Sequence, residues 1–369
     1  MPPLRPMLAK SVPDLPEGAP GRWWFEPKWD GFRCIVFRDG DEVELGSRND
    51  RPLTRYFPEL LDPLRGFLPQ RCVLDGELVV PGPDGLDFNA LQQRVHPAES
   101  RVNRLAEETP ASFVAFDLLA LEDHSLLDVP LRDRRALLEK VFEGVEAPLH
   151  LTPGTYDRAT AEDWFSRFEG AGLDGVMSKA PDGIYESNKR TQIKVKHERT
   201  ADCVVAGFRP HKSGDGPGSL MLGLYDEEGR LHHLGVASSF SAKRRAELAG
   251  ELAPHVAEDL SSHPWGEWAS AVAHESGEHG RLPGAVSRWN ATKDLSFTPL
   301  RPDLVAEVAY ERFDGGKFRH NARFRRWRPD KDARSCTFDQ LEVVPAFELS
   351  AVFSAADGVG VGGGSAPSR

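Results

Sequence analysis

Cysteine is scarce in this chain, and long apolar runs are absent. The four cysteines are scattered singly, with no CxxC pair and no histidine partner at zinc-finger spacing. That scarcity excludes a disulfide framework and a structural zinc module, and it indicates a reducing compartment. No apolar run approaches the roughly 20 residues that a membrane span needs. The N-terminus, MPPLRPMLAK, lacks the apolar segment of a secretory signal. We therefore expect a cytoplasmic protein that does not contact a membrane.

Net positive charge is also missing. The formal net charge is −11, which excludes a uniformly basic nucleic-acid binder. The distribution is uneven, however, because residues 317–331 contain seven basic residues and a single acid, Asp330. Such a run is often only a solvated surface, but it leaves a polyanionic partner open, with weak and salt-sensitive binding.

The length of 369 residues allows two domains, each with its own core. Residues 1–200 predict short strands at 72–80, 112–121 and 192–196, a hairpin over 29–45, and helices at 131–142 and 159–168. The sequence pattern changes near residue 200, which marks the expected boundary between the two domains. Residues 201–350 predict strands at 201–208, 220–225, 231–236, 305–313 and 336–344, a helix at 241–260, and a loop at 261–284. Five short strands and one helix suit a closed all-β barrel of the OB type. The Gly/Ser/Ala-rich segment 351–369 predicts a disordered tail.

Lys28 is the first candidate for a chemical role. It lies in Glu26-Pro27-Lys28-Trp29-Asp30-Gly31, crowded by aromatic residues. A lysine acts as a nucleophile only when neutral, so its site must lower its pKa by desolvation or by neighbouring cations. A lysine among aromatics can equally be a surface residue with a buried stem. A four-residue pattern alone does not decide between these readings.

An ordered series of motifs follows Lys28, and it resembles the nucleotidyltransferase superfamily of DNA ligases, RNA ligases and mRNA-capping enzymes. Lys28-Trp29-Asp30-Gly31 is similar to motif I. The later motifs, in the family's order, are Ser47-Arg48-Asn49, Leu74-Asp75-Gly76-Glu77-Leu78, the run Phe113 to Leu119, Asp174-Gly175-Val176-Met177-Ser178-Lys179 and Lys194-Val195-Lys196. The resemblance implies an α+β nucleotidyltransferase (adenylation) domain with antiparallel sheets, followed by the OB-fold barrel.

The resemblance also implies a role for each residue. Lys28 would become adenylylated, with Lys194 and Lys196 on the α-phosphate. Glu77 and Asp174 would hold Mg²⁺, or alternatively Mn²⁺. Phe116 would stack on the adenine and Glu26 would lie near its edge. Arg33 and Arg48 would hold the ribose and a terminal phosphate, and Arg190 a further phosphate. Taken singly, each of these residues also suits an ordinary core or surface position.

Two positions depart from the family's pattern. Motif IV usually begins with glutamate, and Asp174 is one methylene shorter. We expect this difference to shift or weaken the metal. Motif V often has a tryptophan where Gln192 stands. This second difference puts little of the mechanism in doubt.

The basic run in the second domain contains Arg328-Pro329-Asp330-Lys331, which resembles motif VI of the ligase barrel. Arg328 and Lys331 would clamp the pyrophosphate. No NAD-specific region is visible, so ATP is the expected nucleotide. The span from Met7 to Val344 resembles the small bacterial stand-alone enzymes of the ligase C type. That resemblance predicts a monomer that seals nicked duplex DNA, alone or with repair proteins. An RNA ligase, a capping enzyme and a catalytically silent nucleic-acid-binding module stay open as alternatives.

Overall fold

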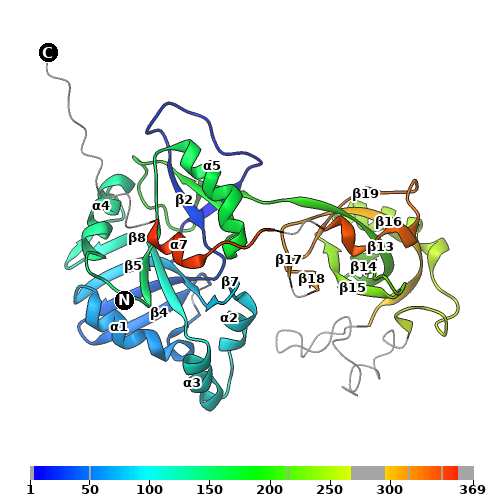
Figure 1. Cartoon of the computed structure of the whole chain (residues 1–369), viewed down its shortest axis with the longest axis horizontal. Coiled ribbons are helices and arrows are strands. Elements are labelled where there is room, and N and C mark those ends of the chain that lie inside the picture. Colours follow the sequence, from blue (N-terminus) through cyan, green and yellow to red (C-terminus); the bar gives the residue numbers. More distant parts are fainter. Residues whose placement is uncertain are drawn as a thin grey trace. The chain divides into compact units, whose positions relative to one another are not determined.

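Two compact units make up the chain (Figure 1). The computed structural model describes residues 4–49, 51–212, 214, 216–266, 296–314, 316–341 and 344–355. The first unit comprises Met1–Lys196 together with Val344–Arg369, and the second comprises His197–Val343. The sequence predicted that the second domain extends to residue 350, whereas the chain rejoins the first unit at Val344. The second unit is therefore an insertion within the first.

Two sheets form the first unit. The larger sheet has the order β10 (Leu149–Leu151), β8 (Ser112–Leu121), β5 (Arg71–Val79), β3 (Phe32–Asp39) and β4 (Glu42–Ser47), and β9 (His124–Ser125) pairs with β8. The smaller sheet has the order β1 (Leu8–Ser11), β12 (Arg190–Lys196), β11 (Gly175–Lys179) and β2 (Trp24–Lys28). Only the β1–β12 and β10–β8 pairs of these two sheets are parallel. The predicted α+β domain with antiparallel sheets is confirmed.

Apolar side chains from both sheets meet in one core. This cluster includes Phe25 of β2, Val176 of β11 and Val195 of β12 from the smaller sheet, and Val79 and Val114 from the larger one. Burial of such strand faces drives the two sheets together. A second cluster covers the other side of the larger sheet. There, helices pack on β3, β5 and β8.

Six helices and a small hairpin complete the described part of the first unit. The helices are α1 (Leu61–Phe67), α2 (Phe88–Arg94), α3 (Glu99–Glu108), α4 (Leu131–Val141), α5 (Arg158–Arg167) and α7 (Leu349–Ser354). The hairpin joins β6 (Pro81–Gly82) and β7 (Gly85–Leu86), and 3₁₀ turns span Thr54–Tyr56, Pro58–Leu60 and Phe168–Ala171. Asp87 and Asp157 cap α2 and α5, because their carboxylates accept backbone N–H groups of the first turn.

The second unit is a closed barrel. Its strands have the order β15 (Leu231–Ser238), β14 (Pro217–Tyr225), β13 (Arg199–Pro210), β16 (Thr298–Tyr310) and β19 (Arg323–Trp327). A bridge between Ala237 and Ala322 joins the two edges of this sheet. Outside the barrel sheet lie α6 (Ala242–Leu252), the hairpin of β17 (Phe313–Asp314) and β18 (Lys317–Phe318), and 3₁₀ turns at Ala253–His255, Ala333–Ser335 and Phe338–Gln340. The predicted all-β barrel of the OB type is confirmed.

Two local predictions for the second half need correction. The helix expected over 241–260 ends at Leu252, because Pro254 lacks the N–H that a continuing helix requires. The strand expected over 336–344 is wrong, since 3₁₀ turns occupy Ala333–Ser335 and Phe338–Gln340. The last barrel strand is instead β19, which lies within the basic run. The expected loop at 261–284 and tail at 351–369 fall largely outside the described residues. Within the tail, α7 continues to Ser354.

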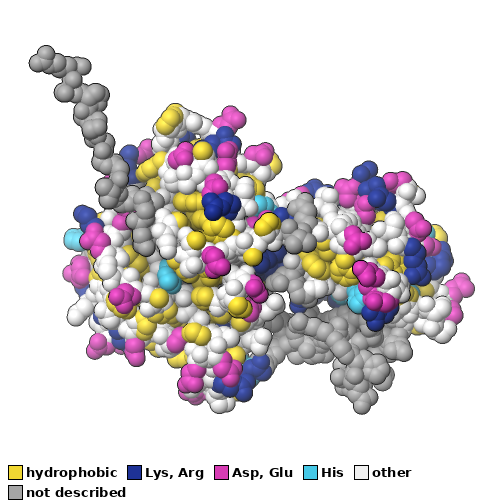
Figure 2. Space-filling view, viewed as in Figure 1, with side chains coloured by type: hydrophobic (Ala, Val, Ile, Leu, Met, Phe, Trp, Pro, Cys, Tyr) yellow, Lys and Arg dark blue, Asp and Glu magenta, His cyan; other side chains and the backbone are white. Residues whose placement is uncertain are grey.

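The surface carries charges of both signs. Figure 2 shows acidic and basic side chains interspersed over the visible face of each unit, in line with the composition. All four cysteines are buried and free. Among the described residues, no helix is long and apolar enough to cross a membrane.

A buried ion pair fixes β8 to α4. Arg134 donates two hydrogen bonds of 2.8 Å to Asp117, and the two side chains are 2% and 1% exposed. We predict that Asp117→Ala lowers the free energy of unfolding by about 3–5 kcal/mol, because it leaves a buried guanidinium uncompensated. Glu108→Ala removes an exposed pair with Arg104 and should cost no more than about 1 kcal/mol. Chemical denaturation of both variants measures the difference, and equal losses would contradict the assignment.

Candidate active site

Lys28 meets an acid from the neighbouring strand at the end of β2. Pairing of β2 with β11 sets Gly175 opposite Lys28, so Asp174 lies beside the lysine despite a sequence separation of 146. The Lys28 Nζ donates to the Asp174 Oδ2 at 2.7 Å, and the Asp174 N–H donates to the Lys28 carbonyl at 2.9 Å. The lysine side chain is 19% exposed, so it is held in place and still open to a ligand.

Asp174 is shared by two lysines. The Lys196 Nζ on β12 lies 3.3 Å from the oxygen that Lys28 contacts. Burial disfavours the charged form of this carboxyl, but Lys28 and Lys196 outweigh burial and lower its pKa to about 2. The carboxylate is therefore ionised at neutral pH. The shorter side chain of aspartate reaches both cations from this strand position.

Glu77 lies against the turn that follows the lysine. Its Oε1 accepts the Gly31 N–H at 3.2 Å. A Cβ at Gly31 would lie 2.0 Å from the Leu78 carbonyl oxygen and 3.0 Å from the Glu77 Cγ. Only glycine lets the chain pass this close to β5, which explains the glycine of the motif. Burial raises the pKa of Glu77 to about 7, although Arg33 and Lys28 oppose this rise. A bound cation would favour its ionised form.

Arg33 is held by a buried acid on the adjacent strand. It donates two hydrogen bonds of 2.5 Å to Asp75, which is fully buried. Asp75 also accepts the Tyr185 hydroxyl at 2.6 Å, and that hydroxyl accepts the Met7 N–H at 3.0 Å. Burial alone would lower the pKa of Arg33, but Asp75 raises it overall, so the guanidinium stays charged. This chain of hydrogen bonds ties the N-terminal segment to the site.

Phe116 carries two cations on its ring. The Arg33 Cζ lies 4.4 Å and the Lys179 Nζ 4.9 Å from the ring centroid, both within cation–π range. Lys179 also forms a 2.5 Å ion pair with Glu26, and both side chains are almost fully buried. Glu26 accepts the Trp24 indole N–H at 2.7 Å as well. Lys179 is thus a site residue to which the sequence reading gave no role. Its lysine was visible in motif IV, but its partner was not.

One pocket of about 200 Å³ collects most of the predicted residues. Its predicted lining residues are Glu26, Lys28, Arg33, Arg48, Glu77, Phe116, Arg190 and Lys194. Asp174 and Lys196 are not lining residues, but they join the site through their contact at Lys28. The sequence reading missed Lys179, Met177 and the segment Pro6–Ala9, which also line the pocket. The N-terminal segment carries no chemical signal in its sequence.

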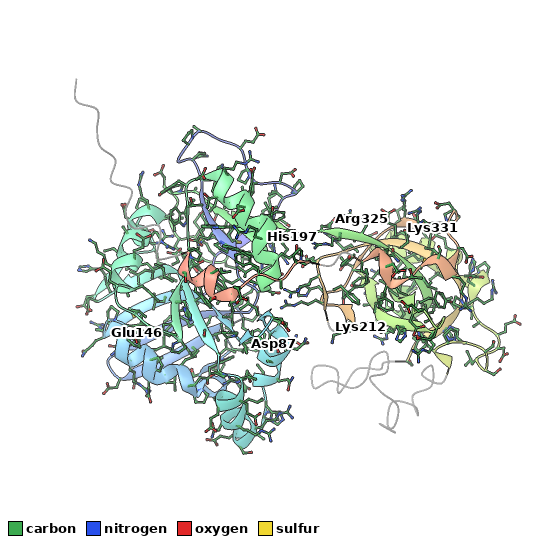
Figure 3. The ribbon with its side chains drawn as sticks, in the orientation of Figure 1. Asp87, Glu146, His197, Lys212, Arg325 and Lys331 are labelled. Carbon is green, nitrogen blue, oxygen red and sulfur yellow. The ribbon has the colours of Figure 1, made fainter. Side chains whose placement is uncertain are left out.

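Arg328 and Lys331 belong to the second unit. Arg328 donates two hydrogen bonds of 3.0 Å to Asp202 and others to Asp330, and its side chain is 16% exposed. Lys331 is 43% exposed, with its Nζ 3.6 Å from Asp202. Figure 3 labels Lys331 in the segment after β19. The two residues therefore share one acid but differ in how openly they present their charge.

The first-unit site combines a partly exposed lysine amine with cations suited to phosphate. Lys28 supplies the amine, Arg48, Arg190 and Lys194 supply positive charge, and Phe116 supplies an aromatic face. The described residues contain no cluster of three or more metal-ligating side chains. Two carboxylates near one lysine still suit a hard cation such as Mg²⁺, which keeps water and phosphate oxygens as its other ligands.

Comparisons with known families agree with this geometry. The model described as "ATP dependent DNA ligase domain" matches residues 6–196. The model described as "ATP dependent DNA ligase C terminal region" matches residues 213–331. DNA ligase C of Mycobacterium tuberculosis is 56% identical over 347 residues, which cover 93% of this chain and 94% of that relative. DNA ligase C2 of Mycolicibacterium smegmatis is 56% identical over 346 residues, covering 94% and 96%.

A solved structure of a Lig E DNA ligase has the same fold. The TM-score is 0.52 at 18% sequence identity, and the match covers 88% of this chain and 99% of that one. At this identity the similarity concerns the fold alone.

Gly31 offers a test of the close approach beside the lysine. Gly31→Ala should destabilise the protein by about 1–3 kcal/mol, because its methyl group collides with the β5 backbone. Gly66→Ala is the matched control, since a Cβ at this helical glycine meets nothing within 4 Å. That variant should be neutral or slightly stabilising. Thermal or chemical unfolding compares the two, and an unchanged midpoint for Gly31→Ala would refute the steric argument.

Proposed function

The chain belongs to the ATP-dependent DNA ligase family, and from this premise we propose which residues carry the joining of DNA ends. A ligase of this family seals a nick between a 3′-hydroxyl and a 5′-phosphate through a lysyl-AMP intermediate. The observation that carries the assignment is the position of Lys28, at a pocket lined with cations and in contact with Asp174. The family favours DNA over the RNA-ligase and capping alternatives.

Lys28 is the proposed nucleophile. Its Nζ attacks the α-phosphorus of ATP, a P–N bond forms, and the bond to pyrophosphate breaks. The attacking amine must first lose a proton. AMP then passes to the 5′-phosphate of the nick. Finally the 3′-hydroxyl attacks that phosphate, and AMP leaves.

The other pocket residues bind and orient the nucleotide. Lys194 and Lys196 neutralise the α-phosphate, and Phe116 stacks on the adenine. Arg33 and Lys179 both lie within cation–π range of the Phe116 ring, which supports a positioning role for both. Glu26 lies near the base edge, held by Lys179. Exposed Arg48 and Arg190 are available for the ribose, for a terminal phosphate or for the nick.

Glu77 and Asp174 are the proposed ligands of a divalent cation. Mg²⁺, or Mn²⁺ in its place, would neutralise phosphate oxygens and compete with Lys28 for the Asp174 carboxylate. The raised pKa of Glu77 supports this role, because a buried carboxyl gains most from a neighbouring cation.

Arg328 and Lys331 are proposed to contact the pyrophosphate. Their place in the R-x-D-K motif supports this, and the exposure of Lys331 favours it as the direct contact. The substrate is nicked duplex DNA, and we propose a cytoplasmic monomer that acts in repair, alone or with repair proteins.

Substitution of Lys28 tests the nucleophile. Lys28→Ala should reduce transfer of radiolabel from [α-³²P]ATP to the protein below detection and abolish nick sealing. Lys189→Ala is the control, because this lysine is exposed and forms a surface ion pair with Glu186. Circular dichroism checks that both variants fold. Label that persists in Lys28→Ala would sink the assignment.

The two motif VI residues can be separated by step. Arg328→Ala together with Lys331→Ala should slow self-adenylylation by about tenfold or more, and slow sealing of pre-adenylylated nicks much less. Lys331→Ala alone should still slow self-adenylylation more than it slows the sealing of pre-adenylylated nicks. Arg328→Ala alone also removes the 3.0 Å pair with Asp202, leaves that acid the longer 3.6 Å contact with Lys331, and should lower stability. Equal loss in the two assays would mean that these residues do not serve the leaving group.

A further inference from the structure

The C-terminal segment returns from the second unit and packs against the neighbour of the nucleophile. Residues 344–355 belong to the first unit, with α7 shown in red on it in Figure 1. Phe353 of α7 stacks on Trp29, with centroids 5.3 Å apart and planes inclined by 13°. Phe353 also stacks on His150, with ring centroids 3.9 Å apart and planes inclined by 14°. Three rings therefore lie in series behind Lys28.

Trp29 is held in place by its indole hydrogen bond as well as by the ring stack. Its indole N–H donates to the Thr152 hydroxyl at 2.8 Å, and its side chain is only 4% exposed. The Lys28 Nζ lies 3.4 Å from the Trp29 carbonyl oxygen. The position of Trp29 thus sets both the backbone that carries the lysine and a polar contact of its amine.

His150 gives the stack an uncharged outer ring. Burial lowers the pKa of His150 to about 4, so the imidazole is neutral at physiological pH. A neutral ring packs on Phe353 without the cost of burying a charge.

The rest of the segment is firmly docked. Leu349 and Val352 are buried in the core cluster that also contains Phe25, Trp29 and Val176. Phe347 packs on Phe168, with centroids 5.3 Å apart. A Cβ at Gly170 would lie 2.1 Å from the Pro345 carbonyl oxygen, so the segment's backbone runs directly against this glycine. A helix of six residues does not persist by itself, and these contacts hold it.

We propose that Phe353 is a positioning residue for Lys28, which it holds in attacking geometry through Trp29. This inference rests on the proposed function, since it concerns the step in which Lys28 attacks ATP. Small displacements of a reacting atom are costly, and about 1 Å can slow a reaction a hundredfold. The third step of sealing does not use the Lys28 amine as a nucleophile, so the effect should fall on lysyl-AMP formation.

The test compares Phe353→Ala with Val352→Ala in the full-length protein. Val352 is fully buried on the same helix and in the same core cluster but contributes no ring to the stack, so its loss should cost stability without removing the stacked ring. Phe353→Ala should slow labelling by [α-³²P]ATP by about tenfold or more at saturating ATP, with little change in KM. Val352→Ala should label within about twofold of the wild type at a temperature where both stay folded. Sealing of a pre-adenylylated nick should be nearly unchanged in both.

Rescue by another ring separates positioning from general packing. Phe353→Tyr keeps the stack and should restore most of the labelling rate, whereas Phe353→Leu keeps apolar volume and should not. Labelling that falls in proportion to unfolding midpoint across all the variants would overturn the proposal, as would wild-type labelling by Phe353→Ala. Failure of the wild type itself to label would instead overturn the proposed function, and this inference with it.

Discussion

The contact between Lys28 and Asp174 is the constraint on which the site depends. It exists because β2 and β11 pair antiparallel in a register that puts Gly175 opposite Lys28. Next to β11, β12 brings Lys196 to the same carboxylate. Three chain segments far apart in sequence thus meet at one acid. A one-residue slip of β11 would turn its side chains to the opposite face and leave two lysines without their common partner.

Charge balance explains how so many cations coexist in a small pocket. Arg33 is compensated by Asp75, Lys179 by Glu26, and Lys28 with Lys196 by Asp174. Each compensating acid is almost fully buried, where an ion pair is screened less than at the surface. The pocket can therefore hold Lys28, Arg33 and Lys179 in fixed positions before the proposed nucleotide binds. Such preorganisation is what makes electrostatic stabilisation effective, because no reorganisation is required during the reaction.

Sequence reasoning went furthest where local pattern and chemistry coincide. The strand at 112–121 matches β8, because a nearly continuous apolar run predicts a buried strand. The hairpin over 29–45 matches β3 and β4, because the Asp39-Gly40 turn joins two strand-like segments. The pocket residues were found because a fixed order of motifs identifies them together. The basic residues of β19 were interpreted as a charged surface patch and not as a strand, because the side chains of this strand are mostly exposed. The ring stack on Trp29 and the Lys179–Glu26 pair depend on tertiary contacts that no local pattern encodes.

The return of the chain to the first unit has a consequence for biosynthesis. A protein emerges from the ribosome with its N-terminus first, and an N-terminal domain commonly folds before the next one is made. Here the core behind Trp29 includes Leu349 and Val352, which are translated after the whole barrel. The unit that starts first is therefore completed last. A message truncated between residues 197 and 349 yields a chain that carries every residue of the Lys28 pocket but lacks part of the core behind this lysine.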